Sequence, residues 1–175
     1  MHPPAARLAI EEVPLTDPRV QRLVAEVQAH YVVIYGGPDD SPLDAGEFDP
    51  PSGLFLLGSS AGEPVAMGGW RLRPDLDARL GGPAAEVKRM FVSPRARRRG
   101  HAAIVLRELE RTARDAGVVQ LVLETGTMQP EAIALYESAG YTPTVRFGHY
   151  ADSELSRYYA KRLERTTPTR GRQDP

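Results

Sequence analysis

Cysteine is missing from this chain of 175 residues, and so are long apolar runs and an excess of charge of either sign. Without cysteine there is no disulfide framework, no thiolate nucleophile and no cysteine-ligated zinc. No stretch approaches the roughly 20 apolar residues that a membrane-spanning helix needs, and the N-terminal residues lack the pattern of a signal peptide. Lys and Arg number 22 and Asp and Glu number 23, which is not the charge balance of an electrostatic nucleic-acid binder. We therefore expect a cytoplasmic protein that binds neither a membrane nor nucleic acid.

The remaining composition is that of one globular domain. Apolar residues make up 41% of the chain and charged residues 26%, which is enough apolar surface for a single core. Residues 166–175 contain no apolar anchor, so they are predicted to form a disordered tail. The domain is therefore expected to span residues 1–165.

Apolar periodicity and turn residues divide the chain into an alternation of strands and helices. The segment 86–124 predicts a strand, a basic turn, a helix and a second strand, which is a βαβ unit. Its helix carries apolar residues at i, i+3, i+4, i+7 and i+11 and ends at Gly117. The class is α/β. The other predicted elements are a strand at 6–10, a helix at 19–35, a hairpin of 54–58 and 64–71, a helix at 130–139, and strands at 144–148 and 156–161.

The basic turn of the βαβ unit, RRRGHA from Arg97 to Ala102, is the first candidate site. The first N–H groups of a helix lack partners and the helix dipole is positive there, so such a turn favours an anion such as pyrophosphate. The sequence matches neither the P-loop nor the dinucleotide-binding glycine pattern. The residues alone leave two interpretations open, an anion site or a solvated basic turn.

Two linked motifs resemble the GNAT superfamily of N-acetyltransferases. The pattern RxxGxA from Arg97 is similar to the acyl-CoA signature of that family, which has Gln or Arg, two variable residues, Gly, one variable residue, and Gly or Ala. The pattern QxxAxxLYxxxGY from Gln129 is similar to the family's NxxAxxLYxxxGF and differs at its first and last positions. The resemblance is strong over residues 85–141 and weak at the N-terminus.

The resemblance implies a mixed, V-shaped central sheet flanked by helices on both faces. The strands beginning near residues 86 and 118 would start as parallel neighbours and then splay apart to admit the pantetheine arm of acetyl-CoA, the cosubstrate. The main chain of residues 90–92 would bind pantetheine and the thioester carbonyl, and the N–H groups of 97–102 would bind the pyrophosphate. No metal is implied. The cofactor-binding residues implied are Met90, Phe91, Val92, Arg97, Arg98, Arg99, Gly100, His101, Ala102 and Gln129.

Acetyl transfer to an amine requires a neutral nitrogen, although an alkylammonium group has a pKa near ~10.4. Glu86 lies eleven residues before Arg97, the spacing at which some members of the resembled family carry a general base on a strand, while others use water. Strict alternation places Glu86, Lys88 and Met90 on one sheet face unless a bulge intervenes. The other interpretation is an exposed glutamate paired with Lys88 or Arg89.

The departing CoA thiolate needs a proton, and Tyr136 occupies the motif position at which the resembled family commonly places that general acid. Spacing alone also allows a packed tyrosine on the apolar row of its helix. For the acceptor, Tyr31, Tyr35, Trp70 and the acidic loop 36–49 could form a wall that suits a cationic amine. A solvated acidic loop beside core aromatics is the alternative.

The sequence thus predicts a single-domain enzyme that transfers the acetyl group of acetyl-CoA directly to a primary amine of a small molecule or peptide. We expect a ternary complex, because no cysteine is available for a covalent intermediate. The alternative is a non-catalytic acyl-CoA-binding regulatory module. A homodimer is also compatible with the predicted sheet edges.

Overall fold

The computed structural model describes residues 7–164 as one mixed sheet of seven strands in the order β1-β2-β3-β4-β5-β7-β6. The tail expected at 166–175 lies outside the described residues. The strands are β1 (Ala9–Glu12), β2 (Gly53–Ser60), β3 (Glu63–Leu72), β4 (Ala84–Val92), β5 (Gln120–Gly126), β6 (Thr142–Pro143) and β7 (Ser156–Arg162). The helices are α1 (Pro18–Tyr35), α2 (Pro74–Leu80), α3 (His101–Asp115) and α4 (Pro130–Ser138), with 3-10 turns η1 (Ala45–Phe48) and η2 (Pro94–Ala96).

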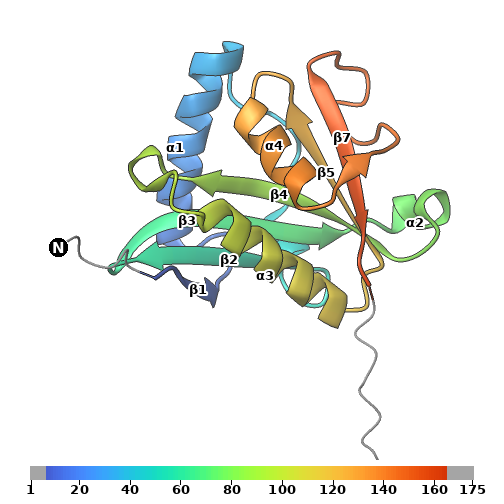
Figure 1. Cartoon of the computed structure of the whole chain (residues 1–175), viewed down its shortest axis with the longest axis horizontal. Coiled ribbons are helices and arrows are strands. Elements are labelled where there is room, and N and C mark those ends of the chain that lie inside the picture. Colours follow the sequence, from blue (N-terminus) through green and yellow to red (C-terminus); the bar gives the residue numbers. More distant parts are fainter. Residues whose placement is uncertain (1–6, 165–175) are drawn as a thin grey trace, which may run out of the picture.

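The sheet opens between its two parallel strands. β4 and β5 pair from Ala84 with Gln120 to Val87 with Leu123, and beyond that point they diverge in Figure 1. The neighbouring pairs, β3 with β4 and β5 with β7, are antiparallel and continue on either side of the opening. The predicted mixed, V-shaped sheet is therefore confirmed.

Buried side chains hold helices on both faces of the sheet. α3 and α4 cover one face, where Leu109 and Tyr136 join the cluster that includes Leu121 of β5, and Figure 1 shows both helices on its near side. α1 covers the other face of β2 to β4 with an apolar row that includes Val20. On that same face α2 packs against β5 near Val122, which points away from its neighbour Leu121 as strand alternation requires.

The predicted α3 helix is confirmed, and its two ends are set by glycine. Gly100 precedes the helix with φ of 75° and Gly117 follows it with φ of 86°, a left-handed conformation that L side chains rarely adopt. Its apolar row, predicted from the spacing of Ala102 to Ala113, faces the sheet, and Leu109 is fully buried.

Two segments differ from the sequence-based expectation. The helix α2 was not predicted, because it has only seven residues and no side-chain cap at Arg73. The strand expected at 144–148 is wrong: the short β6 pairs with β7 at Thr142 and Pro143 instead. Phe147 then leaves the sheet and packs its ring against Tyr158, 5.1 Å between centroids. The turn of the chain toward this contact ends the strand.

A β-bulge interrupts β4 at the opening. Gly69 pairs with Lys88 and Met67 pairs with Phe91, so Arg89 and Met90 both lie opposite Gly68. Arg89 has φ of 59°, and Met90 packs over Gly68, where a Cβ would come within 2.8 Å of its sulfur. The bulge that the sequence analysis allowed for is therefore present, and beyond Lys88 it moves Met90 to the opposite face of the sheet.

Candidate active site

A cavity of about 310 Å³ fills the opening between β4 and β5. Its walls come from residues 87–90 of β4, residues 124–126 of β5, Tyr31 and Tyr35 of α1, and Tyr136 of α4. Two loops that are far apart in the sequence also line it, one with Asp40 and the other with Tyr150. Its volume is that of a small-molecule site.

The expected pantetheine-binding segment borders this cavity. Phe91 and Val92 pair with β3, while the other edge of β4 has lost its partner after Val87. Main-chain groups on that edge can therefore bond an extended ligand as an additional strand. Met90 lines the cavity, whereas the side chain of Phe91 is buried on the α1 side.

The basic turn leads into the N-terminus of α3. Gly100 is exposed, and a Cβ built on it meets nothing within 4 Å, so an anion could approach the first N–H groups of His101 and Ala102. Arg98 and Arg99 are exposed beside it.

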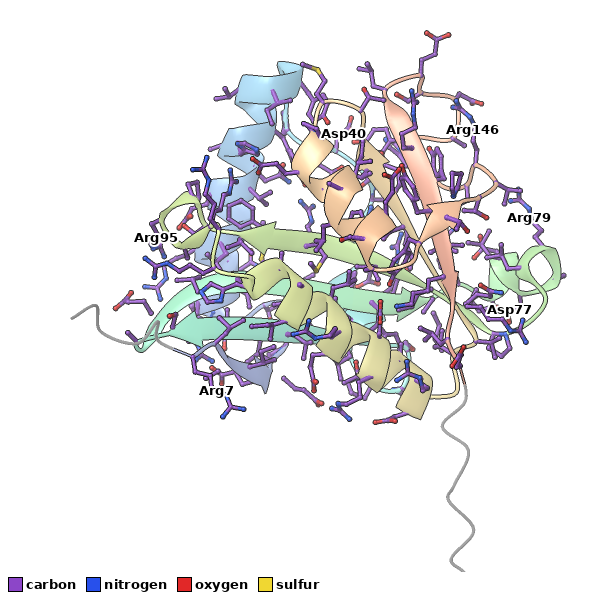
Figure 2. The ribbon with its side chains drawn as sticks, viewed as in Figure 1. Arg7, Asp40, Asp77, Arg79, Arg95 and Arg146 are labelled. Atoms are coloured by element: carbon purple, nitrogen blue, oxygen red, sulfur yellow. The ribbon has the colours of Figure 1, made fainter. Side chains whose placement is uncertain are left out.

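Two arginines, Arg97 within the turn and Arg95 just before it, brace the turn through contacts with neighbouring elements. Arg97 donates from Nε to the carbonyl of Val92 at 3.1 Å. Arg95, at the α1 edge of the molecule in Figure 2, binds Glu26 at 3.0 Å. Their contacts fix the turn to β4 and to α1.

His101 is the first residue of α3 and is buried. Neither ring nitrogen has a hydrogen-bond partner among the described residues. Desolvation, helped by the nearby charge of Arg99, lowers its pKa, so the imidazole is neutral at pH 7. Its main-chain N–H remains part of the helix terminus.

Tyr136 projects from α4 toward the cavity. Its ring packs edge-on against Tyr141 at 5.8 Å, and burial raises the pKa of its hydroxyl, with further contributions from Tyr31 and Glu124. The phenol is therefore held in its protonated form, as a proton donor must be.

Gln129, the residue before α4, orders the rim of the cavity. It makes no side-chain cap to its own helix and donates from Nε2 to the Tyr35 hydroxyl at 3.3 Å. That hydroxyl lies directly over Gly126, and a Cβ there would overlap it. The position therefore accommodates only glycine without displacing Tyr35.

Glu86 lies elsewhere than expected. It is buried, and its Oε2 accepts hydrogen bonds from Arg73 Nη1 at 2.6 Å and from Arg71 Nη2 at 3.0 Å. It lines a second cavity of about 390 Å³ and is not part of the wall of the first. Glu86 is only 3% exposed, so the alternative of an exposed glutamate is wrong. Its lysine contact is with Lys88, whose Nζ lies 3.9 Å from Oε1.

Glu124 is the carboxylate that the sequence analysis missed. It follows Leu123, the last residue of β5 that pairs with β4, and it lines both cavities. Desolvation raises its pKa, Asp39 and Glu86 raise it further, and the hydrogen bond to Ser156 and the charge of Lys88 oppose the rise. The one signal for Glu124 in the sequence was its place as a polar residue directly after a run of apolar strand residues.

The acidic loop is tied to the chain's C-terminal part. The Tyr150 hydroxyl lies 2.8 Å from Asp39 Oδ1 and 2.9 Å from Asp40 Oδ1, and His149 Nε2 lies 3.3 Å from Asp40. Figure 2 places Asp40 between α1 and β7. Trp70 does not join this wall, because it is buried in the core and donates to Thr112 Oγ1 at 3.0 Å.

No group of three His, Asp or Glu side chains in residues 7–164 is placed to hold a metal ion. Within the same range no helix has both the length and the hydropathy to cross a bilayer.

Comparisons with known proteins agree with this geometry. Residues 20–141 match the family model described as the acetyltransferase (GNAT) family. The chain is 34% identical over 152 residues to an IAA acetyltransferase of Azospirillum brasilense, a match that covers 87% of this chain and 95% of that protein.

Solved structures with the same fold include two informative neighbours. One, from Klebsiella pneumoniae and provisionally named an acyl-CoA N-acyltransferase, superposes with a TM-score of 0.73 at 29% identity over 90% of this chain and 98% of that one. Another, a GNAT acetyltransferase of Elizabethkingia anophelis with acetyl-CoA bound, has a TM-score of 0.61 at 15% identity over 89% of this chain and 98% of that one. The resemblance in the two sequence motifs is thereby confirmed, and the chain belongs to the GNAT family of acetyltransferases, which act on acyl-CoA.

Proposed function

We propose that this chain transfers the acetyl group of acetyl-CoA directly to a primary amine in a ternary complex. The observation that carries the proposal is that Glu124 and Tyr136, a carboxylate and a phenol, line one cavity in the opening between β4 and β5. One can take a proton and the other can give one. The unpaired edge of β4 lies between these two groups and the basic turn.

Acetyl-CoA fits the groups that surround the opening. The main chain of residues 90–92 offers N–H and C=O groups to an amide-containing arm, and an N–H aimed at the thioester oxygen would stabilise negative charge there. The N–H groups of Gly100 to Ala102 and the exposed side chains of Arg98 and Arg99 suit the pyrophosphate. Arg97 contributes by bracing the turn against Val92.

The proposed chemistry assigns two proton transfers to this chain. Glu124 takes a proton from the ammonium group, which leaves a neutral nitrogen to attack the thioester carbon. The C–N bond forms, the C–S bond breaks, and Tyr136 donates its proton to the departing sulfur and recovers one from the nitrogen through solvent. One proton is released overall for each amide and thiol produced.

Glu124 suits the role of base better than Glu86 does. Both guanidinium groups of Arg71 and Arg73 already donate to Glu86 Oε2, and Glu86 faces the second cavity. Glu124 borders both cavities, and desolvation raises its pKa toward the pH at which a general base works well. The raised pKa of a buried group in a cavity is typical of functional sites.

The first experiment measures acetyl-CoA binding by calorimetry with two matched variants. Gly100→Glu places a carboxylate at the proposed pyrophosphate site, and we expect it to abolish micromolar binding. Gly117→Glu is the control, because Gly117 has the same left-handed φ and open surroundings but lies at the other end of α3. Equal binding by both variants would remove the pyrophosphate assignment.

The second experiment follows thiol release with a panel of primary amines. Release that depends on the amine, with formation of the N-acetyl product, supports the transferase proposal. Tight binding of acetyl-CoA with no acetylation of any amine would favour the alternative of a non-catalytic acyl-CoA-binding module.

A further inference from the structure

Arg89 is a buried cation with too few partners. Its side chain is 8% exposed, and Nε and Nη1 make no hydrogen bond in the described part of the chain. In the described part of the chain its ion pair is with Asp39, whose Oδ2 lies 3.6 Å from Nη1. A buried guanidinium without hydrogen bonds is costly, so such a group in a cavity wall indicates a missing anionic partner. The bulge in β4 places Arg89 in the wall of the first cavity.

Lys88, the preceding residue, is similarly underused. Its side chain is 12% exposed, and Nζ lies 3.4 Å from Ser41 Oγ and 3.9 Å from Glu86 Oε1. It lines both cavities, as Glu124 does. Lys88 and Glu124 therefore lie where the two cavities adjoin, and they bring a cationic and an acidic side chain to that place.

The nearby acidic side chains already have partners. Asp39 and Asp40 lie against the Tyr150 hydroxyl, and Asp44 accepts from the backbone N–H of Gly46. Glu47 binds Arg71. These acidic side chains thus have contacts of their own, and the loosely paired cations of the cavity wall are Lys88 and Arg89, beside Glu124.

We propose that the acceptor is a primary amine that also carries a carboxylate, of the kind found in a free α-amino acid. This inference rests on the proposed amine acetylation. The amine would lie at Glu124 and the carboxylate at Lys88 and Arg89. Both groups of an α-amino acid are attached to one carbon, so the residues that receive them must be neighbours. Lys88 and Glu124 directly follow the last pair of β4 and β5 and line the same cavities. The side chain of the acceptor would extend into the second cavity, between Leu43 and Phe147.

The experiment compares matched acceptors on the native chain. For phenylalanine and for leucine, kcat/KM is measured for the free L-amino acid, for its amide, and for the decarboxylated amine. We expect the free acid to exceed both analogues by about 10- to 100-fold, as bonds to a charged group would give. The amine of the amide is less basic than the amine of the free acid, so a larger fraction of it is neutral at a given pH. A preference for the free acid over the amide therefore cannot arise from amine basicity.

Variants then test the residues. Lys88→Gln and Arg89→Lys are expected to bring the ratio of acid to decarboxylated amine toward one. Arg7→Gln, which removes an exposed cation just before β1, far from the opening in Figure 2, is expected to leave the ratio as it is. Because Arg89 is buried and its variant could unfold, a second measurement uses the native chain: 3-phenylpropionate, which has the carboxylate and no amine, should inhibit competitively against the amine.

The outcomes separate the two proposals. If amines are acetylated but the carboxylate gives no advantage, or the ratio does not respond to Lys88→Gln, the carboxylate inference is overturned and amine acetylation stands. If acetyl-CoA binds and no amine of any class is acetylated, both proposals fall. A preference for the acid that Lys88→Gln removes and Arg7→Gln retains supports the inference.

Discussion

Val87 of β4 and Leu123 of β5 form the last pair of their parallel register. The next residue on each strand, Lys88 and Glu124, lines the cavity. The position at which the backbone ladder ends is thus the position at which two charged side chains enter the site. The divergence of β4 and β5 therefore frees a strand edge for an extended ligand and also places charged side chains beside that ligand.

Replacing Glu124 by Gln should lower kcat/KM by roughly 10²- to 10⁴-fold, the usual contribution of a general base. Since desolvation raises the pKa of Glu124 above its ordinary 4.5, the active carboxylate is lost as the pH falls through that higher value. The acid limb of the native pH profile of kcat/KM should therefore lie above the range of an ordinary carboxyl group, and it should vanish in Glu124→Gln.

Glu86→Gln is the matched control for that variant. We expect a loss of stability on the order of 3 kcal/mol in denaturant unfolding, because Arg71 and Arg73 lose a buried charged partner. The acid limb of the pH profile should persist. Its disappearance in Glu86→Gln, with an intact limb in Glu124→Gln, would return the role of base to Glu86.

Tyr136→Phe should lower kcat by roughly 10²-fold while the Kd for acetyl-CoA stays the same, because the variant removes a proton donor and no binding surface. The ring keeps its contact with Tyr141, so the melting temperature should change little. Calorimetry and steady-state kinetics on one preparation measure both quantities. A variant with native turnover would show that Tyr136 is only a packed side chain.

Gly53→Ala should destabilise the protein by about 1–3 kcal/mol or more. A Cβ at this position would clash with three backbone atoms. It would lie 2.5 Å from the Trp70 carbonyl oxygen and 2.9 Å from Phe48 Cα, and it would overlap the carbonyl oxygen of Glu47. None of these backbone atoms can move alone. Gly46→Ala is the control, since its nearest neighbour is Asp44 Oδ1 at 3.5 Å. Chemical unfolding of both variants gives the comparison, and equal stabilities would contradict the expectation.

Tyr150→Phe tests the contact between the acidic loop 36–49 and the loop that carries Tyr150. For Asp39, desolvation raises the pKa, but hydrogen bonds from Ser41 and Tyr150 outweigh it, and for Asp40 the bond from Tyr150 is the largest cause of the lowering. A carboxyl group whose pKa in the folded state is below its ordinary value of 3.8 stabilises the fold at pH values above 3.8. This stabilisation is lost as the pH falls through the lower pKa of the folded state. The variant should therefore melt below the native chain at pH 7, with a gap that narrows below about pH 3.8. A gap of constant size down to pH 2 would mean that the Tyr150 hydroxyl acts otherwise.

The local patterns of the sequence were sufficient for the elements that carry their own periodicity and caps. The spacing of apolar residues predicted α3, and the turn residues and apolar row of 130–139 predicted α4 with Tyr136 on its buried side. The V-shaped sheet was predicted from the resemblance. The two strands that form its opening, β4 and β5, and the helix between them, α3, are consecutive in the chain.

Features that depend on distant contacts were not predictable. Lys88 and Glu124 become neighbours only because β4 and β5 pair for four residues and then diverge, and neither local sequence indicates where that pairing ends. The bulge at Arg89 requires that the residue opposite it on β3, Gly68, has no side chain. The partners of Glu86 come from the end of β3, so the strand that carries it gave no sign of its ion pairs.

The position of β7 has a consequence for how the chain is made. This strand is the last element of the described residues, yet it lies between β5 and β6 in the sheet and pairs with β5 over its full length. Until residue 162 has left the ribosome, the edge of β5 next to Glu124 has no partner, and an unpaired apolar edge is prone to join other chains. A nascent or truncated chain that ends before Ser156 should therefore need a chaperone to stay out of aggregates.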